Sequence, residues 1–453
     1  MTMSRVLARR FASTTFAMIP EPVRDKATLH IADAIGVGLA ASTCAIAEPY
    51  STYARTITHQ GSSTCLADGR MVDASQAALV NGGLIHSLEF DDTHTASIIH
   101  GSSVILPTCL AMAEEQGLSG EELIRLYVVG YEALIRLGLS APGDLQRRGF
   151  QATSVAGSLV AAAISASALG ADENGIVAAM GIALSQASGS MEFLSNGSTV
   201  KSLHPGWAAH AGILAARLAA SGLTGPESAI EGRFGFYALF ADGEPSGRAK
   251  ALDFDTIGTD WRLPEVAVKL YPACHYLHAF IEGALSLREQ GIVPSDVESF
   301  VCRAPAGTAG VVCEPWADKQ RPPSGHALRW SLPGIVATAL IDGRVDLASF
   351  ENQLSAAALD LAARMTWEPL AASAFPKRFD GELIVRTRDG GEKRIAIDDA
   401  YGNASRPVRP EEYRAKFLAN ASRRLWLERA EILAARLADL ARADTVSLEG
   451  YLN

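Results

Sequence analysis

The amino-acid sequence predicts a mainly α-helical protein with one large all-helical domain and one smaller α+β domain. Three observations support this fold class. Residues 22–223 consist almost entirely of Ala- and Leu-rich segments with helical spacing, β-type runs occur only after residue 264, and helical spacing returns after residue 410. We therefore expect residues 1–264 and 400–453 to form a discontinuous helical domain and residues 265–399 to form the α+β domain.

The helices of the large domain are predicted from apolar periodicity with Gly, Asp or Pro near the ends. Leu7, Phe11 and Phe16 fit an amphipathic opening helix. Because Ala and Gly are frequent throughout this domain, we expect its helices to pack closely. The other helices are expected over residues 23–42, 75–89, 104–116, 120–139, 153–169, 172–187 and 206–220, and within residues 410–443.

The smaller domain is predicted from a change in pattern after residue 264. Residues 297–303 form a short β-type run, and residues 382–397 alternate on both sides of an Arg-Asp-Gly-Gly turn, which predicts a hairpin. Helical spacing covers residues 275–290, 325–340 and 356–365. This mixture indicates an α+β arrangement.

Composition excludes several classes of protein. A net charge of −10 and a pI near 5.5 argue against a nucleic-acid binder. The most apolar run, residues 155–171, is interrupted by Ser and Gly, so no membrane-spanning helix is predicted. The six cysteines are scattered without metal-ligand spacing, which predicts free thiols. The Arg-rich N-terminus precedes no apolar stretch, so we expect a cytoplasmic location.

A first cluster of chemically active side chains lies in the segment HSLEFDDTH, residues 86–94, with His100 following it. On a helix, His86, Glu89 and Thr93 would share one face. The acids Asp91 and Asp92 have two interpretations, as caps of the next element or as site residues. A metal centre is an alternative, with the ligands His86, Asp91, Asp92, His94 and His100.

A second cluster surrounds Lys201, the only Lys or Arg between Arg148 and Arg217. Lys201 lies in a Gly/Ser-rich loop just before a helix expected to begin at Pro205. A lone cation beside a helix N-terminus predicts a carboxylate or phosphate site. His204 is either the N-cap or a second site residue, whereas His210 is expected to pack in the core.

A third cluster, residues 269–278, lies at the expected domain boundary, where ligand sites are common. His275 begins the following helix and is expected to face a cleft, whereas His278 is expected to be packed. Motifs typical of nucleotide-binding loops and of α/β-hydrolases are absent from the sequence.

Four segments together resemble the MmgE/PrpD family: HSLEFDDTH, VKSLHPGWAAHAG, KLYPACHYLHA and RPPSGHALRWSLPGIVATALIDG. This family includes 2-methylcitrate dehydratase, cis-aconitate decarboxylase and iminodisuccinate epimerase. The resemblance implies a helical domain with an α+β lid, a homodimer, a small anionic carboxylate substrate, and no metal or organic cofactor. It also implies a cleft built from Glu89, Thr93, His100, Lys201 and His275.

Two positions depart from the family pattern. Gln151 stands where the decarboxylases and many dehydratases carry a histidine, and Trp316 stands where the decarboxylases carry a tyrosine. Gln151 cannot titrate and Trp316 supplies no acidic phenol, so the loss of a positioned acid is expected to disfavour dehydration.

The sequence therefore favours cofactor-independent abstraction of an α-proton from a di- or tricarboxylate, with epimerisation of an iminodisuccinate-like substrate placed first. The alternatives are a 2-methylcitrate dehydratase-like or cis-aconitate decarboxylase-like lyase, a metallohydrolase, and a non-catalytic helical scaffold. The expected catalytic residues are His100, Lys201 and Glu89. The expected substrate-binding residues are Thr93, His204, His275, Gln151 and Trp316.

Overall fold

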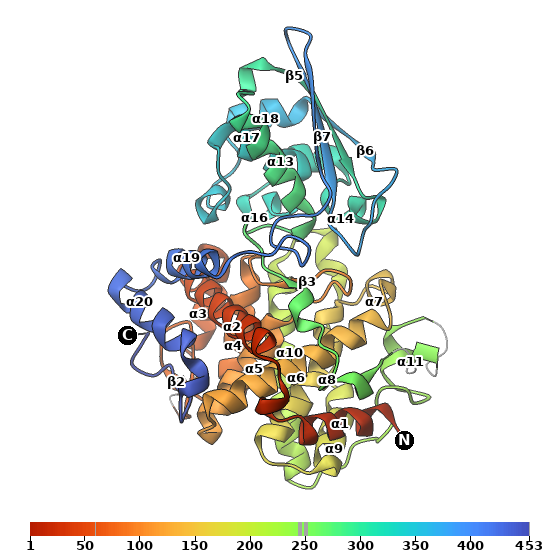
Figure 1. Cartoon of the computed structure of the whole chain (residues 1–453), viewed down its shortest axis with the longest axis vertical. Helices are drawn as coiled ribbons and strands as arrows, with labels where there is room; N and C mark the ends of the chain where they lie inside the picture. Colours follow the sequence, from red (N-terminus) through yellow and green to blue (C-terminus); the bar gives the residue numbers. More distant parts are fainter. Residues whose placement is uncertain (59, 243–246, 249–251, 453) are drawn as a thin grey trace. The chain divides into compact units, whose positions relative to one another are not determined.

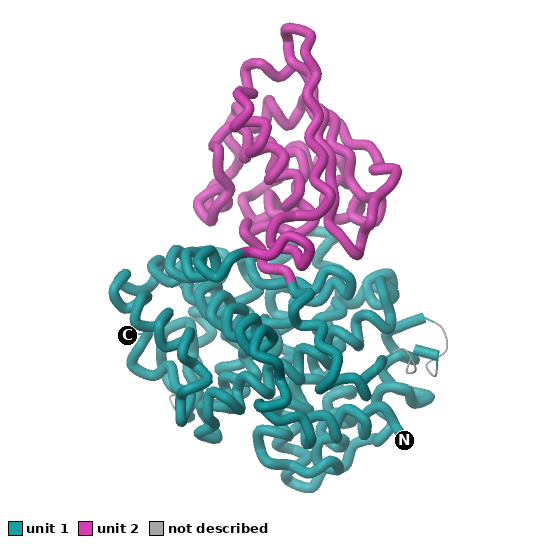
Figure 2. Tube along the Cα trace, viewed as in Figure 1, with its two compact units in different colours: residues 1–266, 409–453 teal, residues 267–408 magenta. Residues whose placement is uncertain are grey.

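The structure is a computed structural model that describes residues 1–58, 60–242, 247–248 and 252–452, and it is mainly α-helical (Figure 1). The chain divides into two compact units (Figure 2). Unit 1 comprises Met1–Val266 and Arg409–Asn453, and unit 2 comprises Ala267–Val408. The sequence pattern predicts these two boundaries after residue 264 and before residue 400.

Unit 1 is built almost entirely from helices, and each long helix expected from the sequence is present. Its three short strands, β1 (Ser63–Thr64), β2 (Met71–Val72) and β3 (Thr93–His94), were not predicted. The helices are α1 (Met3–Ser13), α2 (Glu21–Ala41), α3 (Glu48–Ala54), α4 (Ala74–Ser87), α5 (Ser102–Gln116), α6 (Gly120–Leu139), α7 (Asp144–Arg147), α8 (Ala152–Ala168), α9 (Glu173–Leu184), α10 (Leu203–Ala220), α11 (Phe236–Phe240), α19 (Pro410–Ala421) and α20 (Leu427–Ala438).

Small side chains let the helices of unit 1 approach one another closely. Helix α8 packs against α5, α6, α9 and α10, and α10 also packs against α4. A Cβ atom added at Gly212 would lie 2.4 Å from the Cβ of Ala161, and one added at Gly82 would lie 2.6 Å from the Cα of Gly206. The expected close packing is therefore confirmed, and it brings the start of α10 against α4 and α8.

By length and composition, no single helix among the described residues qualifies as a membrane span. One pair of helices, Glu21–Ala41 and Ala45–Ala54, passes that test only when joined, and the pair is bent by 91°.

Unit 2 contains a four-stranded sheet in the order β6 (Met365–Pro369), β5 (Val297–Ala304), β7 (Gly381–Thr387) and β8 (Glu392–Ile397). The expected hairpin is confirmed, since β7 and β8 pair antiparallel. Strand β6 was not predicted, because its pairing with β5 is parallel and joins distant segments. Helix α13 (His278–Glu289) packs on β7, β8 and α17 (Leu332–Asp342), and the other helices are α14 (Ala309–Val312), α15 (Trp316–Gln320), α16 (Gly325–Leu328) and α18 (Ala356–Ala363).

Candidate active site

The segment between α4 and α5 carries several of the expected site residues, and it is not helical. Helix α4 ends at Ser87, and Glu89 adopts a left-handed backbone with a φ of 52°. The expectation that His86, Glu89 and Thr93 share a helix face is therefore wrong. The physical reason is a turn closed by Asp91, whose carboxylate lies 2.7 Å from Nδ1 of His86.

Glu89 and Lys201 form an ion pair through Oε1 and Nζ, which joins two of the clusters found in the sequence. Lys201 lies in the 3₁₀ helix η4 (Thr199–Ser202), directly before α10. The Glu89 side chain is 4% exposed and the Lys201 side chain is 14% exposed. This burial limits screening by water, so the ammonium group is a strong local attractor for a carboxylate.

His100 is held by contacts on its Nδ1 edge. This nitrogen lies 3.1 Å from the Thr93 hydroxyl and 3.1 Å from the carbonyl oxygen of Asp92. A carbonyl oxygen only accepts hydrogen bonds, so Nδ1 carries a proton and a neutral His100 has its lone pair on Nε2. The backbone N–H of His100 donates to the Thr153 hydroxyl, 3.1 Å away, which ties this residue to the start of α8.

A second chain of contacts links α4, α8 and α10 through Gln151. The amide nitrogen of Gln151 lies 3.2 Å from Nε2 of His86, and its amide oxygen lies 2.7 Å from Nδ1 of His204. The rings of His86 and His100 are 5.1 Å apart between centroids. His204 lies one residue inside α10, whose N-cap is Ser202, so the N-cap hypothesis for His204 is wrong.

Asp92 caps α5, which is one of the two interpretations given from the sequence. Its Oδ1 accepts the backbone N–H of Ser102 at 3.1 Å, and its Oδ2 accepts the Ser102 hydroxyl. His30 of α2 lies 3.2 Å from the same Oδ2. Burial acts to raise the pKa of Asp92, but the His30 and Ser102 contacts prevail and hold it below its usual value.

Lys416 of α19 contacts the same segment next to Glu89. Its ammonium group donates to the carbonyl oxygen of Phe90 at 2.9 Å and to the carboxylate of Asp33 at 2.9 Å. Burial raises the pKa of Asp33 to about 6, although Lys416 acts in the opposite direction. The C-terminal part of unit 1 thus fixes the backbone next to Glu89.

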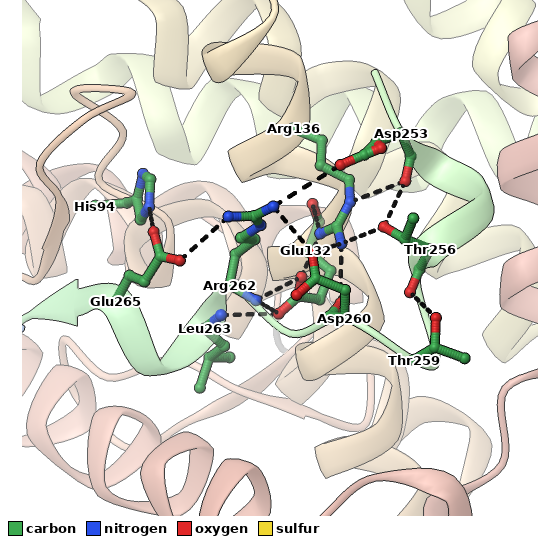
Figure 3. Close-up of polar contacts among 10 residues, drawn as sticks. All are labelled: His94, Glu132, Arg136, Asp253, Thr256, Thr259, Asp260, Arg262, Leu263 and Glu265. Carbon is green, nitrogen blue, oxygen red and sulfur yellow. Dashed lines mark hydrogen bonds and ion pairs between the residues drawn. The ribbon is translucent and has the colours of Figure 1, made fainter. Parts of the chain in front are cut away.

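The segment that follows residue 252 is tied to α6 by one buried carboxylate (Figure 3). Glu132 is fully buried, and its Oε1 accepts the backbone N–H groups of Arg262 and Leu263, both at 2.8 Å. Glu132 also pairs with Arg136, which donates to the carbonyl oxygen of Asp260 at 2.9 Å. These bonds satisfy backbone groups that would otherwise be left unpaired inside the protein.

This network reaches β3 through His94. Nε2 of His94 lies 3.3 Å from Glu265, which also pairs with Arg262 (Figure 3). Nδ1 of His94 lies 2.7 Å from the Ser97 hydroxyl. The position of Thr93, the neighbour of His94 in β3, is therefore set by contacts that continue to α6.

Several side chains that shape the site were not selected from the sequence. His30 and Lys416 lie on helices far along the chain from the site, and His86 and Asp91 are absent from the expected catalytic and substrate-binding residues. The position of His30 within an apolar helix could have indicated a buried polar contact, because buried polar groups need hydrogen-bond partners. Among the described residues, no three His, Cys, Asp or Glu side chains are arranged to hold a metal ion.

Two of the expected site residues belong to unit 2. His275 is buried at the start of η7 (His275–Leu277), with its ring 4.9 Å from that of Phe379. The indole N–H of Trp316 donates to the carbonyl oxygen of Met365 at 3.1 Å. Lys269, which is not among the expected site residues, is fully buried in this unit.

Fold and site together define a helical protein with a largely shielded lysine and several buried histidines, residue types suited to a small carboxylate. The chain belongs to the MmgE/PrpD family. The MmgE/PrpD N-terminal domain matches residues 5–248, and the MmgE/PrpD C-terminal domain matches residues 271–440. The family resemblance described from the sequence is thereby confirmed.

The chain is also similar to proteins named cis-aconitate decarboxylase. The human protein is 30% identical over 424 residues, which cover 89% of this chain and 84% of that protein. The mouse protein is 29% identical, with 89% and 83% covered, and a protein from Aspergillus terreus is 28% identical, with 85% and 82% covered. These relatives support the lyase alternative better than the epimerase that was placed first.

Proposed function

We propose that this chain is a lyase that acts on a small tricarboxylate, with decarboxylation of cis-aconitate as the first reaction to test. The observation that carries this proposal is the similarity to cis-aconitate decarboxylases, which extends over more than four-fifths of both chains. Dehydration of a hydroxylated tricarboxylate is the second candidate. It is favoured by the arrangement of His204 described in the next subsection.

Lys201 is the group that we expect to bind a substrate carboxylate. Its side chain is largely shielded from solvent, and Glu89 is its counter-ion in the absence of substrate. A substrate carboxylate that replaced Glu89 as partner would be held close to the ammonium group. In both reactions, negative charge spreads onto a carboxylate beside the reacting carbon, and a fixed cation stabilises that charge.

The proton inventory differs between the two reactions. Decarboxylation breaks a carbon–carbon bond, releases CO₂ and leaves an electron pair on carbon, so the product takes up one proton. Dehydration removes a proton from carbon, forms the double bond from that electron pair, and releases hydroxide that needs a proton. His100 is a candidate for either transfer. With its proton on Nδ1, the neutral ring can take the carbon proton on Nε2 in dehydration, and the imidazolium form can supply the proton in decarboxylation.

The main argument for epimerisation loses force with this geometry. It rested on the absence of a titratable group at Gln151 and of a phenol at Trp316. Gln151 lies between His86 and His204, so two imidazole rings flank the position that lacks one. Side chains that can transfer protons are therefore present in this region of the site, as the chemistry of a lyase requires.

The test is a product analysis with isotope-labelled cis-aconitate. Purified protein is incubated with uniformly ¹³C-labelled substrate in D₂O, and the products are followed by NMR. We expect ¹³CO₂ and an unsaturated five-carbon dicarboxylate that carries one deuteron. A panel of citrate-type substrates is assayed in parallel for loss of water. Isotope exchange at an α-carbon, with neither release of CO₂ from cis-aconitate nor loss of water from the citrate-type substrates, would overturn the lyase proposal and support the epimerase.

Two variants locate the reaction in the molecule. Lys201→Met keeps a long apolar stem but removes the charge, and turnover should fall by roughly 10²-fold or more. Lys377→Met is the matched control, because Lys377 is exposed, and it should retain full activity. A fully active Lys201→Met protein would refute the assignment of this site.

Cofactor independence, a homodimer and a cytoplasmic location are further parts of this proposal. The first two rest on the family resemblance, and the location rests on the N-terminal sequence pattern. Activity should survive dialysis against EDTA without loss. Light scattering coupled to size exclusion should give twice the chain mass of 47.8 kDa. Metal-dependent activity or a monomeric mass would contradict the corresponding part without affecting the assignment of the reaction.

A further inference from the structure

Four side chains in unit 1 form an unbroken line of polar contacts. Asp91 contacts Nδ1 of His86, Nε2 of His86 contacts the Gln151 amide nitrogen, and the Gln151 amide oxygen contacts Nδ1 of His204. The separations along this line are 2.7, 3.2 and 2.7 Å. All four residues are at least nine-tenths buried.

The carboxylate at one end determines where the protons lie. Asp91, when ionised, only accepts hydrogen bonds, so Nδ1 of His86 must carry a proton. A neutral His86 then has its lone pair on Nε2, which requires the NH₂ group of Gln151 on that side. The amide oxygen consequently faces His204, and Nδ1 of His204 must donate to it. Each step follows from the one before, and the result is a single tautomer of His204.

The backbone around Gln151 explains why this line is held in place. Gln151 is the N-cap of α8 and makes no side-chain capping bond, so its amide is available to the two histidines. Its backbone N–H donates to the carbonyl oxygen of Gly189 at 2.9 Å. The backbones of α4 and α10, which carry His86 and His204, approach each other at Gly82 and Gly206.

His204 also lines a cavity of about 300 Å³, together with Gly189, Phe193, Val200 and Trp207. Phe193 packs edge-on against the His204 ring at 5.9 Å between centroids. Within the described part of the chain, Nδ1 of His204 is occupied by Gln151 and no bond is made by Nε2. Nε2 is therefore the nitrogen that can meet a molecule in this cavity.

We propose that Gln151 is a positioning residue that holds His204 in the Nδ1–H tautomer, so that the unprotonated Nε2 accepts a hydrogen bond from a hydroxyl group of the bound carboxylate. Burial, with smaller effects from His86 and Lys201, lowers the pKa of His204 to about 4, so the ring stays neutral at physiological pH. A lone pair attracts a hydroxyl hydrogen and repels a carboxylate oxygen. The hydroxyl preference rests on the second candidate in the proposed function, dehydration of a hydroxylated tricarboxylate, whereas the tautomer does not.

The tautomer is tested by NMR on protein labelled with ¹⁵N-histidine. Two-bond ¹H–¹⁵N correlations distinguish Nδ1–H from Nε2–H rings, and we expect both His86 and His204 in the Nδ1–H form. Gln151→Met removes both amide contacts, so His204 should become a mixture of tautomers. An ionised carboxylate in Gln151→Glu still offers an acceptor to Nδ1 of His204, so His204 should keep Nδ1–H. His210, whose Nδ1 lies 3.0 Å from the carbonyl oxygen of Ser75, is the internal control and should not change.

The ligand preference is tested with two molecules that differ by one hydroxyl group, citrate and propane-1,2,3-tricarboxylate. By calorimetry, the unaltered protein should bind citrate more tightly by roughly 3- to 10-fold, the effect of one neutral hydrogen bond, and Gln151→Met should abolish the difference. An Nε2–H ring at His204 in the unaltered protein, or an unchanged tautomer in Gln151→Met, would overturn the inference. Absence of binding by both ligands, with the expected tautomers present, would instead contradict the dehydration candidate and leave the tautomer intact.

Discussion

Substitution of Gly82 by Ala should destabilise unit 1 and disturb the site at the same time. A Cβ atom at Gly82 would lie 2.6 Å from the Cα of Gly206 and 2.9 Å from the carbonyl oxygen of Ser103. Both neighbours are backbone atoms that cannot move aside by a change of rotamer. Since carbon atoms prefer separations of about 3.5–4.0 Å, α4 and α10 would have to separate by roughly 1 Å.

Two opposing effects set the size of the change. Overpacking in a close-packed interior costs about 1–3 kcal/mol, and a rigid neighbour places Gly82→Ala toward the upper end. Replacement of a helical Gly by Ala returns about 0.5–1 kcal/mol. The net loss is therefore about 1–2 kcal/mol, which is a factor of about 5–30 in the unfolding equilibrium.

Urea denaturation followed by circular dichroism measures this loss for Gly82→Ala. Gly310→Ala is the control, because this glycine lies in α14 and a Cβ there would meet no atom within 4 Å. The control should be as stable as the unaltered protein or slightly more stable. If Gly82→Ala were equally stable, the close backbone contact between α4 and α10 would be refuted.

Three further predictions concern the support of the site. Lys416→Met removes the partner of the buried Asp33, so the unfolding free energy should fall by about 3–5 kcal/mol in urea denaturation, with partial recovery when Asp33→Asn is added. The pKa of His204 is lowered to about 4 from 6.5, mainly by burial, so only the unfolded chain binds this proton between those pH values. The contribution of the neutral His204 ring to the unfolding free energy is complete above pH 6.5 and is lost as the pH falls toward 4. The melting temperature of His204→Gln should therefore fall less with acid than that of the unaltered protein. An equal fall in both proteins would contradict the pKa shift. Asp92→Asn removes the charge at the start of α5 and should cost about 1–3 kcal/mol in thermal unfolding, whereas Asn at the exposed Asp25 should cost less than about 0.5 kcal/mol.

The helices of unit 1 could be predicted because their signals are local. Apolar spacing and terminal Gly, Asp or Pro residues mark each helix within a few positions, as for α6 at Gly120–Leu139. Strand β6 carried no such signal, since it exists through hydrogen bonds to β5 more than sixty residues earlier in the chain. The turn at Glu89 was missed for a related reason. A left-handed backbone at a residue other than Gly leaves no mark in the sequence, and tertiary contacts impose it.

The site could be predicted only in part. Lys201 was visible because no other cation lies near it in the sequence, and its partner Glu89 was selected independently from another cluster. That the two form an ion pair across 112 residues depends on how α4 and α10 pack, which periodicity does not report. His30 and Lys416 were missed because their partners lie at the far end of the chain or outside their own helices.

The role of Gln151 shows why a residue's own titration is a poor guide to its part in proton chemistry. The Gln151 amide donates on one side and accepts on the other. It therefore transfers no proton, but it determines which nitrogen of the neighbouring histidine carries one. Asp91 determines the tautomer of His86, and Gln151 passes this constraint on to His204. The two histidines are linked through the Gln151 amide and not by a hydrogen bond between their own rings. A histidine at position 151 could protonate at either nitrogen, and the constraint on His204 would then depend on its charge. Gln151 itself carries no charge that changes with pH, so while Asp91 is ionised and the two histidines are neutral, the acceptor in the cavity is set by the packing of α4, α8 and α10.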